Sequence, residues 1–181
     1  MASLRSLRQL LRPDWVVNGT LAQVPLDELI HNPSRPILAL VLDVDRTLLP
    51  RHRGGLPGSM ELWVEEARRQ RPIQLLSNNP SRRRIGGLAQ QVGLPFTTAA
   101  GKPRRSALRR VLAELNLPAQ QVALIGDRLF TDVVAGNRLG LFTVLVKPTD
   151  CQGKPCERDR LQRLELRLAR WLGTSLHTTA Q

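Results

Sequence analysis

The sequence predicts one three-layer α/β domain with a mostly parallel sheet between helices. Short apolar runs alternate with longer segments in which apolar residues recur every three or four positions, and this alternation is typical of strand–helix–strand units. The first run, from Ile37 to Leu42, contains no polar residue, as expected of a strand buried on both faces. A chain of 181 residues has the length of a single domain, so we expect residues 1–181 to form one unit.

The elements follow in order along the chain. We expect an amphipathic helix within residues 1–15, and strands at 37–42, 73–76, 95–98, 122–125 and 142–146. Helices are predicted at 60–70, 81–92, 102–115, 130–139 and 158–173. Gly93 marks the end of one helix and Pro103 the start of the next. In the last helix, leucines recur at helical spacing and should cover one face of the sheet: Leu161, Leu164, Leu168 and Leu172.

The N-terminal helix admits three interpretations. Its leucines and arginines occupy neighbouring faces, which is typical of a helix lying on an anionic membrane. Its arginine-rich, acid-free start also resembles a transit peptide, and the third interpretation is a short helix packed on its own domain. No apolar run could span a membrane and no signal peptide is evident, so we expect a cytoplasmic protein, free or peripheral at a membrane, with organelle targeting left open.

The charge of the chain points to anionic partners. Its 27 Lys and Arg outnumber 15 Asp and Glu, for a net charge of +12. This surplus either keeps the protein soluble or attracts nucleic acid, acidic lipid headgroups or phosphorylated small molecules. With 3% aromatic residues and no Tyr, the chain offers few platforms on which bases could stack, which argues against nucleic acid. Cys151 and Cys156 have no other metal-ligand residues nearby and predict neither a zinc site nor a disulfide.

Two carboxylates, Asp43 and Asp45, directly follow the buried strand at 37–42. Open α/β sheets bind their ligands at the carboxyl ends of the strands, so this pair lies where a site is expected. If the pleat of the strand continues, both side chains point to the same face. Carboxylates that close repel each other unless a cation or a shared proton intervenes. An ordinary turn is the competing interpretation of this pair taken alone.

Three further polar segments follow later strands or begin a helix: Ser-Asn-Asn at 77–79, Gly-Lys-Pro at 101–103 and Gly-Asp-Arg-Leu-Phe-Thr-Asp at 126–132. The order acid pair, hydroxyl, lysine, acid pair resembles the four motifs of the haloacid dehalogenase-like (HAD) phosphatases. Within that superfamily the chain is similar to the YqeG family of subclass IIIA phosphatases, with added likeness at 11–17 and 126–140. The resemblance implies a Rossmann-like HAD fold, with the motifs in a core at 37–146. No cap domain is expected, because the segments 47–73 and 92–102 are both too short to hold one.

The resemblance also implies roles for single residues. Asp43 would be the nucleophile that forms an aspartyl-phosphate, and Asp45 the general acid and base. Ser77 would bind a phosphoryl oxygen, and Lys102 would balance the negative charge of nucleophile and phosphate. Further substrate or phosphate contacts are expected from Thr47, Asn78 and Arg46. The family usually carries Asn where this chain has Arg46, so contacts or charge at that point are expected to differ.

A magnesium site is implied by the same resemblance. Mg²⁺ prefers oxygen ligands and keeps several waters, so few carboxylates suffice to hold it. The expected ligands are the side chains of Asp43 and Asp127 and the backbone carbonyl of Asp45. Asp132 would bind the ion directly or hold a water bound to it.

These roles together imply a Mg²⁺-dependent phosphomonoesterase. A site without a cap suits phosphate displayed on something large, and members of related families dephosphorylate phosphatidylglycerophosphate, so the first hypothesis is a lipid phosphate at a membrane surface. A second hypothesis is a phosphatase for nucleic-acid ends or proteins. A third, from another class, is a non-catalytic module that binds anions or RNA through a relic site.

Overall fold

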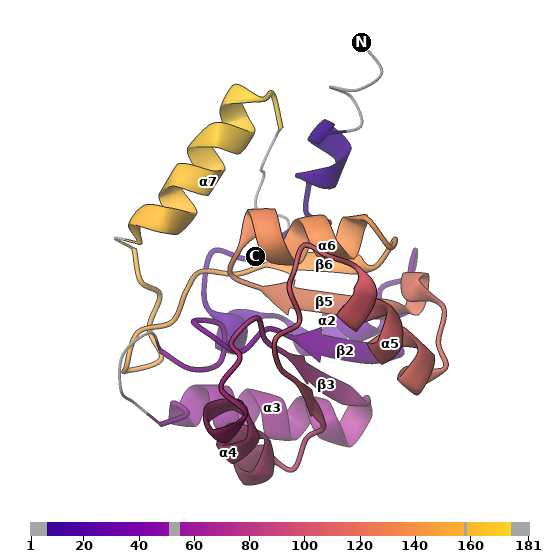
Figure 1. Cartoon of the computed structure of the whole chain (residues 1–181), viewed down its shortest axis with the longest axis vertical. Helices are drawn as coiled ribbons and strands as arrows, with labels where there is room; N and C mark the ends of the chain where they lie inside the picture. Colours follow the sequence, from indigo (N-terminus) through magenta and orange to yellow (C-terminus); the bar gives the residue numbers. More distant parts are fainter. Residues whose placement is uncertain (1–6, 51–54, 158, 175–181) are drawn as a thin grey trace.

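The computed structural model describes residues 7–50, 55–157 and 159–174, and a parallel sheet runs through its centre (Figure 1). The six strands are ordered β1-β6-β5-β2-β3-β4, and every neighbouring pair is parallel. They are β1 (Trp15–Val16), β2 (Ala39–Leu42), β3 (Ile73–Leu76), β4 (Phe96–Thr97), β5 (Val122–Gly126) and β6 (Phe142–Leu145). The predicted Rossmann-like architecture is therefore confirmed.

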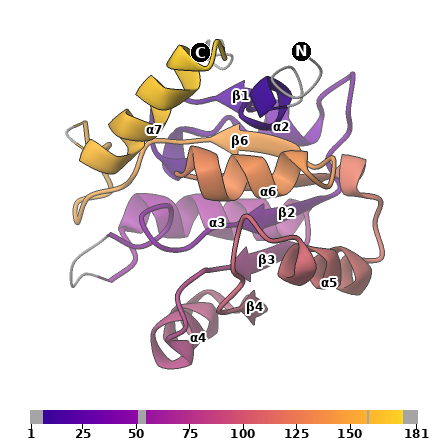
Figure 2. The ribbon, with the colours of Figure 1, turned by 45° about the horizontal axis from the view of Figure 1, so that its top comes forward.

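Helices cover both faces of the sheet. One face packs against α2 (Leu26–Ile30), α3 (Gly58–Gln70) and α4 (Arg82–Val92). The other packs against α5 (Ser106–Leu115) and α6 (Val134–Asn137), which lie in front of the sheet in Figure 2 while α3 lies behind it. Three short turns complete the fold: η1 (Leu21–Gln23), η2 (Ala119–Gln121) and η3 (Leu129–Val133), the last a π-helical turn that leads into α6.

The central strand β2 is buried on both faces, as its apolar sequence predicts. Leu40 and Leu42 point into one core, and Ala39 and Val41 into the other. The chain leaves β2 toward β3 on one side, whereas β5 pairs with the other side of β2. Strand order thus reverses at β2, and the carboxyl ends of β2 and β5 meet at a position where open α/β sheets bind ligands.

The N-terminal helix ends earlier in the chain than expected. Residues 7–10 are helical and residues 1–6 lie outside the described part, but the expected helix does not reach residue 15 because Trp15 and Val16 form β1 on the edge of β6. Leu11 is fully buried in a cluster with Ala169 of the C-terminal helix. The Asn137 amide donates to three backbone carbonyls of the segment: Gln9, Leu10 and Arg12. The described part of the helix therefore packs on its own domain.

The C-terminal helix α7 (Arg160–Trp171) presents a different face than expected. The prediction that its leucines cover the sheet is wrong, because Gln162, Glu165 and Ala169 are the buried residues. Leu161, Leu164 and Leu168 are exposed instead, and of the four predicted leucines only Leu172 is partly buried, against the cluster that contains Leu11. The hydrogen-bond and ion-pair partners of Gln162 and Glu165 are described with the site below. In Figures 1 and 2, α7 stands at the side of the domain rather than over the middle of the sheet.

In the described residues, the segments joining β2 to β3 and β3 to β4 contain loops and the helices α3 and α4, but no folded cap. Among all the residues that the structure describes, no helix is long and apolar enough to cross a bilayer.

Candidate active site

Three buried aspartates converge at the carboxyl ends of β2 and β5. Asp43 follows β2, Asp127 follows β5, and Asp132 lies in η3. One carboxylate oxygen from each lies within 4.8 Å of the others. Because β2 and β5 are parallel neighbours, residues that directly follow them must end at the same edge of the sheet. Of the predicted residues, Asp43, Asp127 and Asp132 are thus brought together.

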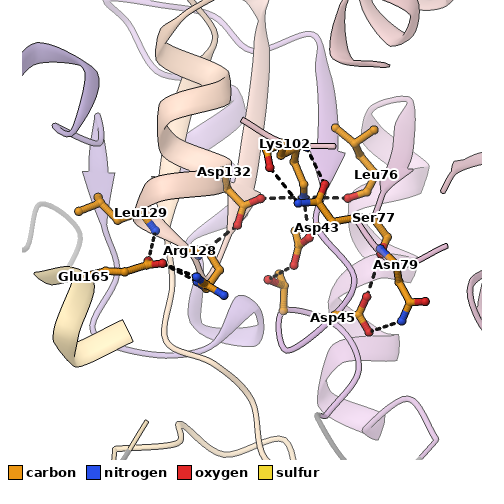
Figure 3. A network of polar contacts seen from close by, with 12 residues as sticks. Asp43, Asp45, Leu76, Ser77, Asn79, Lys102, Arg128, Leu129, Asp132 and Glu165 are labelled. Atoms are coloured by element: carbon orange, nitrogen blue, oxygen red, sulfur yellow. Dashed lines mark hydrogen bonds and ion pairs between the residues drawn. The ribbon is translucent and has the colours of Figure 1, made fainter. Parts of the chain in front are cut away.

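Lys102 joins two of these carboxylates. Its Nζ lies 2.6 Å from Asp43 Oδ1 and 2.7 Å from Asp132 Oδ1, and it also donates to the Leu76 carbonyl at 3.0 Å (Figure 3). Burial alone would lower the pKa of Lys102, but the two carboxylates outweigh it and raise the pKa. The lysine is therefore a fixed positive charge inside the site.

Asp43 is held from both sides. Lys102 donates to Oδ1, and the Thr47 hydroxyl donates to Oδ2 at 3.0 Å. Burial raises the pKa of Asp43 to about 6, although Lys102 pulls in the other direction. Thr47 is fully buried, and its hydroxyl positions the Asp43 carboxylate. Its contact with phosphate stays a prediction.

Asp127 carries the least compensated charge in the cluster. Both of its carboxylate oxygens are buried and accept no hydrogen bond, and Arg46 Nε lies 3.4 Å from Oδ2. Burial, followed by the charges of Asp43 and Asp132, raises the pKa of Asp127 well above its ordinary value. Three carboxylates face one lysine and the Arg46 guanidinium, which Asp159 also binds, so a surplus of negative charge and of oxygen ligands remains. This donor set fits a hard divalent cation such as Mg²⁺.

Asp45 lies at the edge of the pocket, with a side chain 35% exposed. Ser77 Oγ donates to Asp45 Oδ2 at 2.8 Å, and Asn79 Nδ2 donates to Oδ1 at 3.4 Å (Figure 3). Arg84 Nε of α4 lies 3.4 Å from the same Oδ1. The Ser77 hydroxyl thus orients Asp45, and its bond to a phosphoryl oxygen stays a prediction. Sequence reasoning missed Asn79 and Arg84 because neither belongs to a motif position with a known role.

Asn78 positions Lys102. Its Oδ1 accepts from the Lys102 backbone N–H at 2.7 Å, and its Nδ2 donates to the Lys102 carbonyl at 3.0 Å. Both ends of the Asn78 amide thus clamp the loop that carries the lysine, while Asn78 also lines the pocket described below, and its contact with substrate or phosphate stays a prediction.

Arg46 bridges the first motif and the start of α7. It adopts a left-handed backbone conformation with φ of +74°, and its Nη2 lies 2.5 Å from Asp159 Oδ2. Asp159 caps the N-terminus of α7 by accepting from the Gln162 N–H. The guanidinium predicted to contact substrate is therefore already paired with Asp127 and Asp159. It still borders a pocket of about 130 Å³ that is lined by eight residues: Asp43, Asp45, Arg46, Asn78, Lys102, Asp127, Arg128 and Thr131.

Two polar residues of α7 support the loop that carries the second acid pair. Gln162 Nε2 donates to the carbonyls of Asp127 at 2.7 Å and Val146 at 2.8 Å. Glu165 pairs with the Arg128 guanidinium and accepts from the Leu129 N–H at 2.8 Å (Figure 3). The sequence offered one signal for these residues, a single acid and a single amide in a helix otherwise made of Arg, Leu, Ala and Trp.

The absence of a side chain at Gly126 allows the Asp132 carboxylate to lie against the end of β5. A Cβ at this position would lie 2.4 Å from Asp132 Cγ, so any side chain would push Asp132 away. The Arg128 N–H donates to Asp132 Oδ2 at 3.1 Å and holds it in place. The glycine is therefore required by the close approach of the Asp132 carboxylate to the strand.

Comparisons with known proteins agree with this fold and site. Residues 99–162 match the family model described as HAD-hydrolase-like. A structure of an uncharacterized protein from Listeria monocytogenes matches with a TM-score of 0.53 and 15% identity, over 69% of this chain and 85% of that one. A hypothetical protein from Xanthomonas campestris matches with a TM-score of 0.51 and 20% identity, over 84% and 93%. These structural likenesses concern the fold.

Sequence relatives narrow the class. The probable phosphatase YqeG of Bacillus subtilis is 33% identical over 115 residues, which is 63% of this chain and 66% of that protein. The chloroplastic phosphatidylglycerophosphate phosphatase 1 of Chlamydomonas reinhardtii is 30% identical over 151 residues, 78% of this chain and 56% of that protein. The matches thus span less than two thirds of these relatives' lengths. Fold, site and sequence are together similar to those of HAD-like hydrolases, and the relatives include a YqeG-type phosphatase.

Proposed function

We propose that the protein is a Mg²⁺-dependent phosphomonoesterase that acts through an aspartyl-phosphate on Asp43. The observation that carries this proposal is the convergence of Asp43, Asp127 and Asp132, with the ammonium of Lys102 paired to Asp43 and Asp132. A carboxylate that attacks a phosphate dianion needs positive charge beside it. The lysine supplies one such charge, and the oxygens of Asp127, which accept no hydrogen bond, supply a place for a cation.

In the first step a carboxylate oxygen of Asp43 forms a bond to phosphorus, and the bond from phosphorus to the substrate oxygen breaks. Thr47 and Lys102 each contact one oxygen of Asp43, which fixes the direction of that carboxylate. Asp45, at the edge of the pocket, gives its proton to the departing alcohol oxygen. Because Ser77 and Asn79 hold Asp45 by two hydrogen bonds, its carboxyl stays near the leaving group.

In the second step water attacks the phosphorus of the aspartyl-phosphate, and Asp45 accepts a proton from that water. The phosphorus–oxygen bond to Asp43 breaks, so inorganic phosphate leaves and the carboxylate is regenerated. Mg²⁺ would be held by Asp43, Asp127 and the backbone carbonyl of Asp45, with Asp132 beside them. When bound, the ion would neutralise charge on the phosphoryl oxygens.

For the substrate we infer a phosphorylated lipid such as phosphatidylglycerophosphate. The two plant and algal relatives carry that substrate in their names, and the Arabidopsis thaliana protein is 32% identical over 90 residues, 49% of this chain and 26% of that protein. The pocket has no cap among the described residues, which leaves room for a phosphate on a large carrier. The net charge of +12 suits an anionic surface, and we place the protein in the cytoplasm or peripherally on a membrane.

Phosphatases of nucleic-acid ends or of proteins remain the second hypothesis, since the same charge would serve them. A non-catalytic anion- or RNA-binding module is disfavoured because all four aspartates and the lysine line or contact the pocket. A relic site would have no need to retain this set.

The test measures hydrolysis of p-nitrophenyl phosphate by the purified chain with Mg²⁺ and with EDTA. We expect turnover only with Mg²⁺ and a loss of about 10³-fold or more in Asp43→Asn. Asp27→Asn, which changes an exposed aspartate of α2, is the matched control and should keep full activity. Equal activity in EDTA or in Asp43→Asn would refute the mechanism.

The substrate is tested separately. We expect phosphatidylglycerophosphate in vesicles to be hydrolysed faster than a 5′-phosphorylated oligonucleotide or a phosphopeptide. A preference for either of the latter would replace the lipid proposal by the second hypothesis.

A further inference from the structure

Exposed apolar side chains concentrate on one helix of the domain. Of the seven large apolar side chains exposed in the described residues, four belong to α7. Their exposed fractions are 39% for Leu161, 53% for Leu164, 43% for Leu168 and 83% for Trp171. The intervals of three, four and three residues put all four on a single stripe of the helix. We call these four residues the α7 stripe.

The buried side of α7 explains why the stripe faces outward. Gln162 and Glu165 bond to the loop that carries Asp127 and Asp132, and Ala169 packs against the fully buried Leu11. These contacts fix the rotation of the helix about its axis. The α7 stripe therefore faces outward because the opposite side of the helix is bound to the domain.

Arginines flank the stripe along the whole helix. They are Arg160, Arg163, Arg167 and Arg170, and all four are exposed. The helix contains one acid, Glu165, and that carboxylate is turned inward to Arg128. The outer surface of α7 between residues 160 and 171 therefore combines an apolar stripe with positive charge alone. A further arginine adjoins the end of α7, because Arg8 Nε donates to the Leu172 carbonyl at 2.7 Å.

We propose that the outer face of α7 docks on the surface of an anionic lipid bilayer, with the α7 stripe inserted among the acyl chains near the headgroups. Leu and Trp on one side and Arg beside them are the composition of helices that lie in a membrane interface. Each arginine near an anionic surface adds about 1 kcal/mol of attraction. A second copy of the chain fits less well, because two such faces would set arginines against arginines with no carboxylate to pair them.

The docked helix would bring the pocket to the membrane. Gln162 and Glu165 contact the loop of the second acid pair directly, so the surface and the site share one helix. This inference rests on the proposed function in that a lipid-borne phosphate has to be reached at a bilayer.

The first measurement is sedimentation of the full chain with vesicles of equal parts phosphatidylglycerol and phosphatidylcholine, compared with phosphatidylcholine alone. We expect binding to the anionic vesicles and about tenfold or more weaker binding by the variant Leu164→Ser, Leu168→Ser, Trp171→Ser. Leu62→Ser, which changes a 70% exposed leucine on α3, is the matched control and should bind like the unmodified chain.

The second measurement follows Trp171 itself. We expect its fluorescence to shift to shorter wavelength on anionic vesicles, and the shift to vanish in Trp171→Phe. Both readouts are accompanied by p-nitrophenyl phosphate hydrolysis, which the stripe variants should retain because these residues do not line the pocket. Loss of vesicle binding with intact hydrolysis in the stripe variant supports the inference.

Three results would overturn it: unchanged binding of the triple variant, binding without a Trp171 shift, or absence of vesicle binding with a concentration-dependent dimer that the triple variant abolishes. The last result would assign the stripe to a second copy of the chain. Absence of hydrolysis in the unmodified chain would instead count against the proposed function and leave the vesicle result to be judged by itself.

Discussion

The ammonium of Lys102 lies 2.6 Å from the carboxylate of Asp43, and the residues are 5% and 6% exposed. An ion pair shielded in this way is costly to disrupt from one side, because the remaining charge has no solvent to replace its partner. The pair also places a permanent positive charge beside the oxygen that we propose as nucleophile. Stability and reactivity are therefore expected to depend on the same contact.

Replacing Lys102 by methionine should affect both properties. The change leaves Asp43 and Asp132 facing each other without a cation, and we expect a loss of about 3 to 5 kcal/mol in the free energy of unfolding. Aryl phosphate hydrolysis should fall by about 10³-fold or more. Urea unfolding and initial rates measure the two effects. Lys154→Met, at an exposed lysine, should change neither, and wild-type values in Lys102→Met would contradict the role of the pair.

Replacing Thr47 by valine should slow turnover without unfolding the protein. The variant keeps the shape of the side chain but removes the hydroxyl that donates to Asp43 Oδ2. We expect kcat to fall about tenfold with little change in KM, because the hydroxyl orients the carboxylate rather than the substrate. Thr97→Val, at a threonine that contacts Gln74, serves as the control. A rise in KM alone would instead favour a direct phosphate contact by Thr47.

Replacing Gly126 by alanine should displace Asp132. The added Cβ would overlap a carboxylate that the Arg128 N–H and Lys102 hold in place. We expect a loss of about 1 to 3 kcal/mol in stability and a severe loss of activity. Gly87→Ala is the matched control: its Cβ would meet nothing within 4 Å, and in the helix α4 it should stabilise by about 0.5 to 1 kcal/mol. Equal effects of the two substitutions would disprove the steric argument.

Replacing Glu165 by glutamine should weaken metal binding more than catalysis. Glu165 supports the metal ligands Asp127 and Asp132 through the loop between them, where it bonds to Arg128 and Leu129. Loss of such support typically lowers metal affinity 10- to 100-fold, so the Mg²⁺ concentration for half-maximal activity should rise by about that factor. Glu66→Gln, on the exposed side of α3, should leave the Mg²⁺ titration unchanged. An unaltered titration in Glu165→Gln would show that the loop holds without it.

Magnesium alone should stabilise the folded chain. An ion that binds the native carboxylates but not the unfolded chain raises the melting temperature in a concentration-dependent way. We expect this shift at neutral pH and its loss in Asp127→Asn, because Asp127 offers the oxygens that lack hydrogen bonds. Differential scanning fluorimetry with and without Mg²⁺ provides the measurement. A shift of the same size in Asp127→Asn would place the ion elsewhere.

Much of the architecture follows from local pattern. The strand at 73–76 is found at the predicted residues, and Gly93 ends α4 in a left-handed conformation as its position predicts. The two-residue strand β1 was not predicted, although the equally short β4 lies within the strand predicted at 95–98. The pairing of β1 with β6 depends on tertiary contacts, among them the edge-to-face contact of Trp15 with Phe142 at 5.6 Å between ring centroids.

The wrong prediction for α7 has a different cause. Helical spacing identifies a leucine stripe but does not say which side of the helix faces the domain. That choice depends on Arg128 and the Asp127 carbonyl, which bond to Glu165 and Gln162. The same limit applies in the site. The sequence motifs predicted that Thr47, Asn78 and Arg46 lie at the site. Their hydrogen-bond and ion-pair partners depend on the conformation of the folded loops.

The single amide of Gln162 serves two carbonyls, one at the end of β6 and one on the residue that follows β5. A chain that ended before residue 159 would lose the donor to both oxygens and the support of the loop that carries Asp127 and Asp132. A trimmed version prepared for crystallisation or screening should therefore keep all of α7, since an inactive fragment would say little about the intact enzyme.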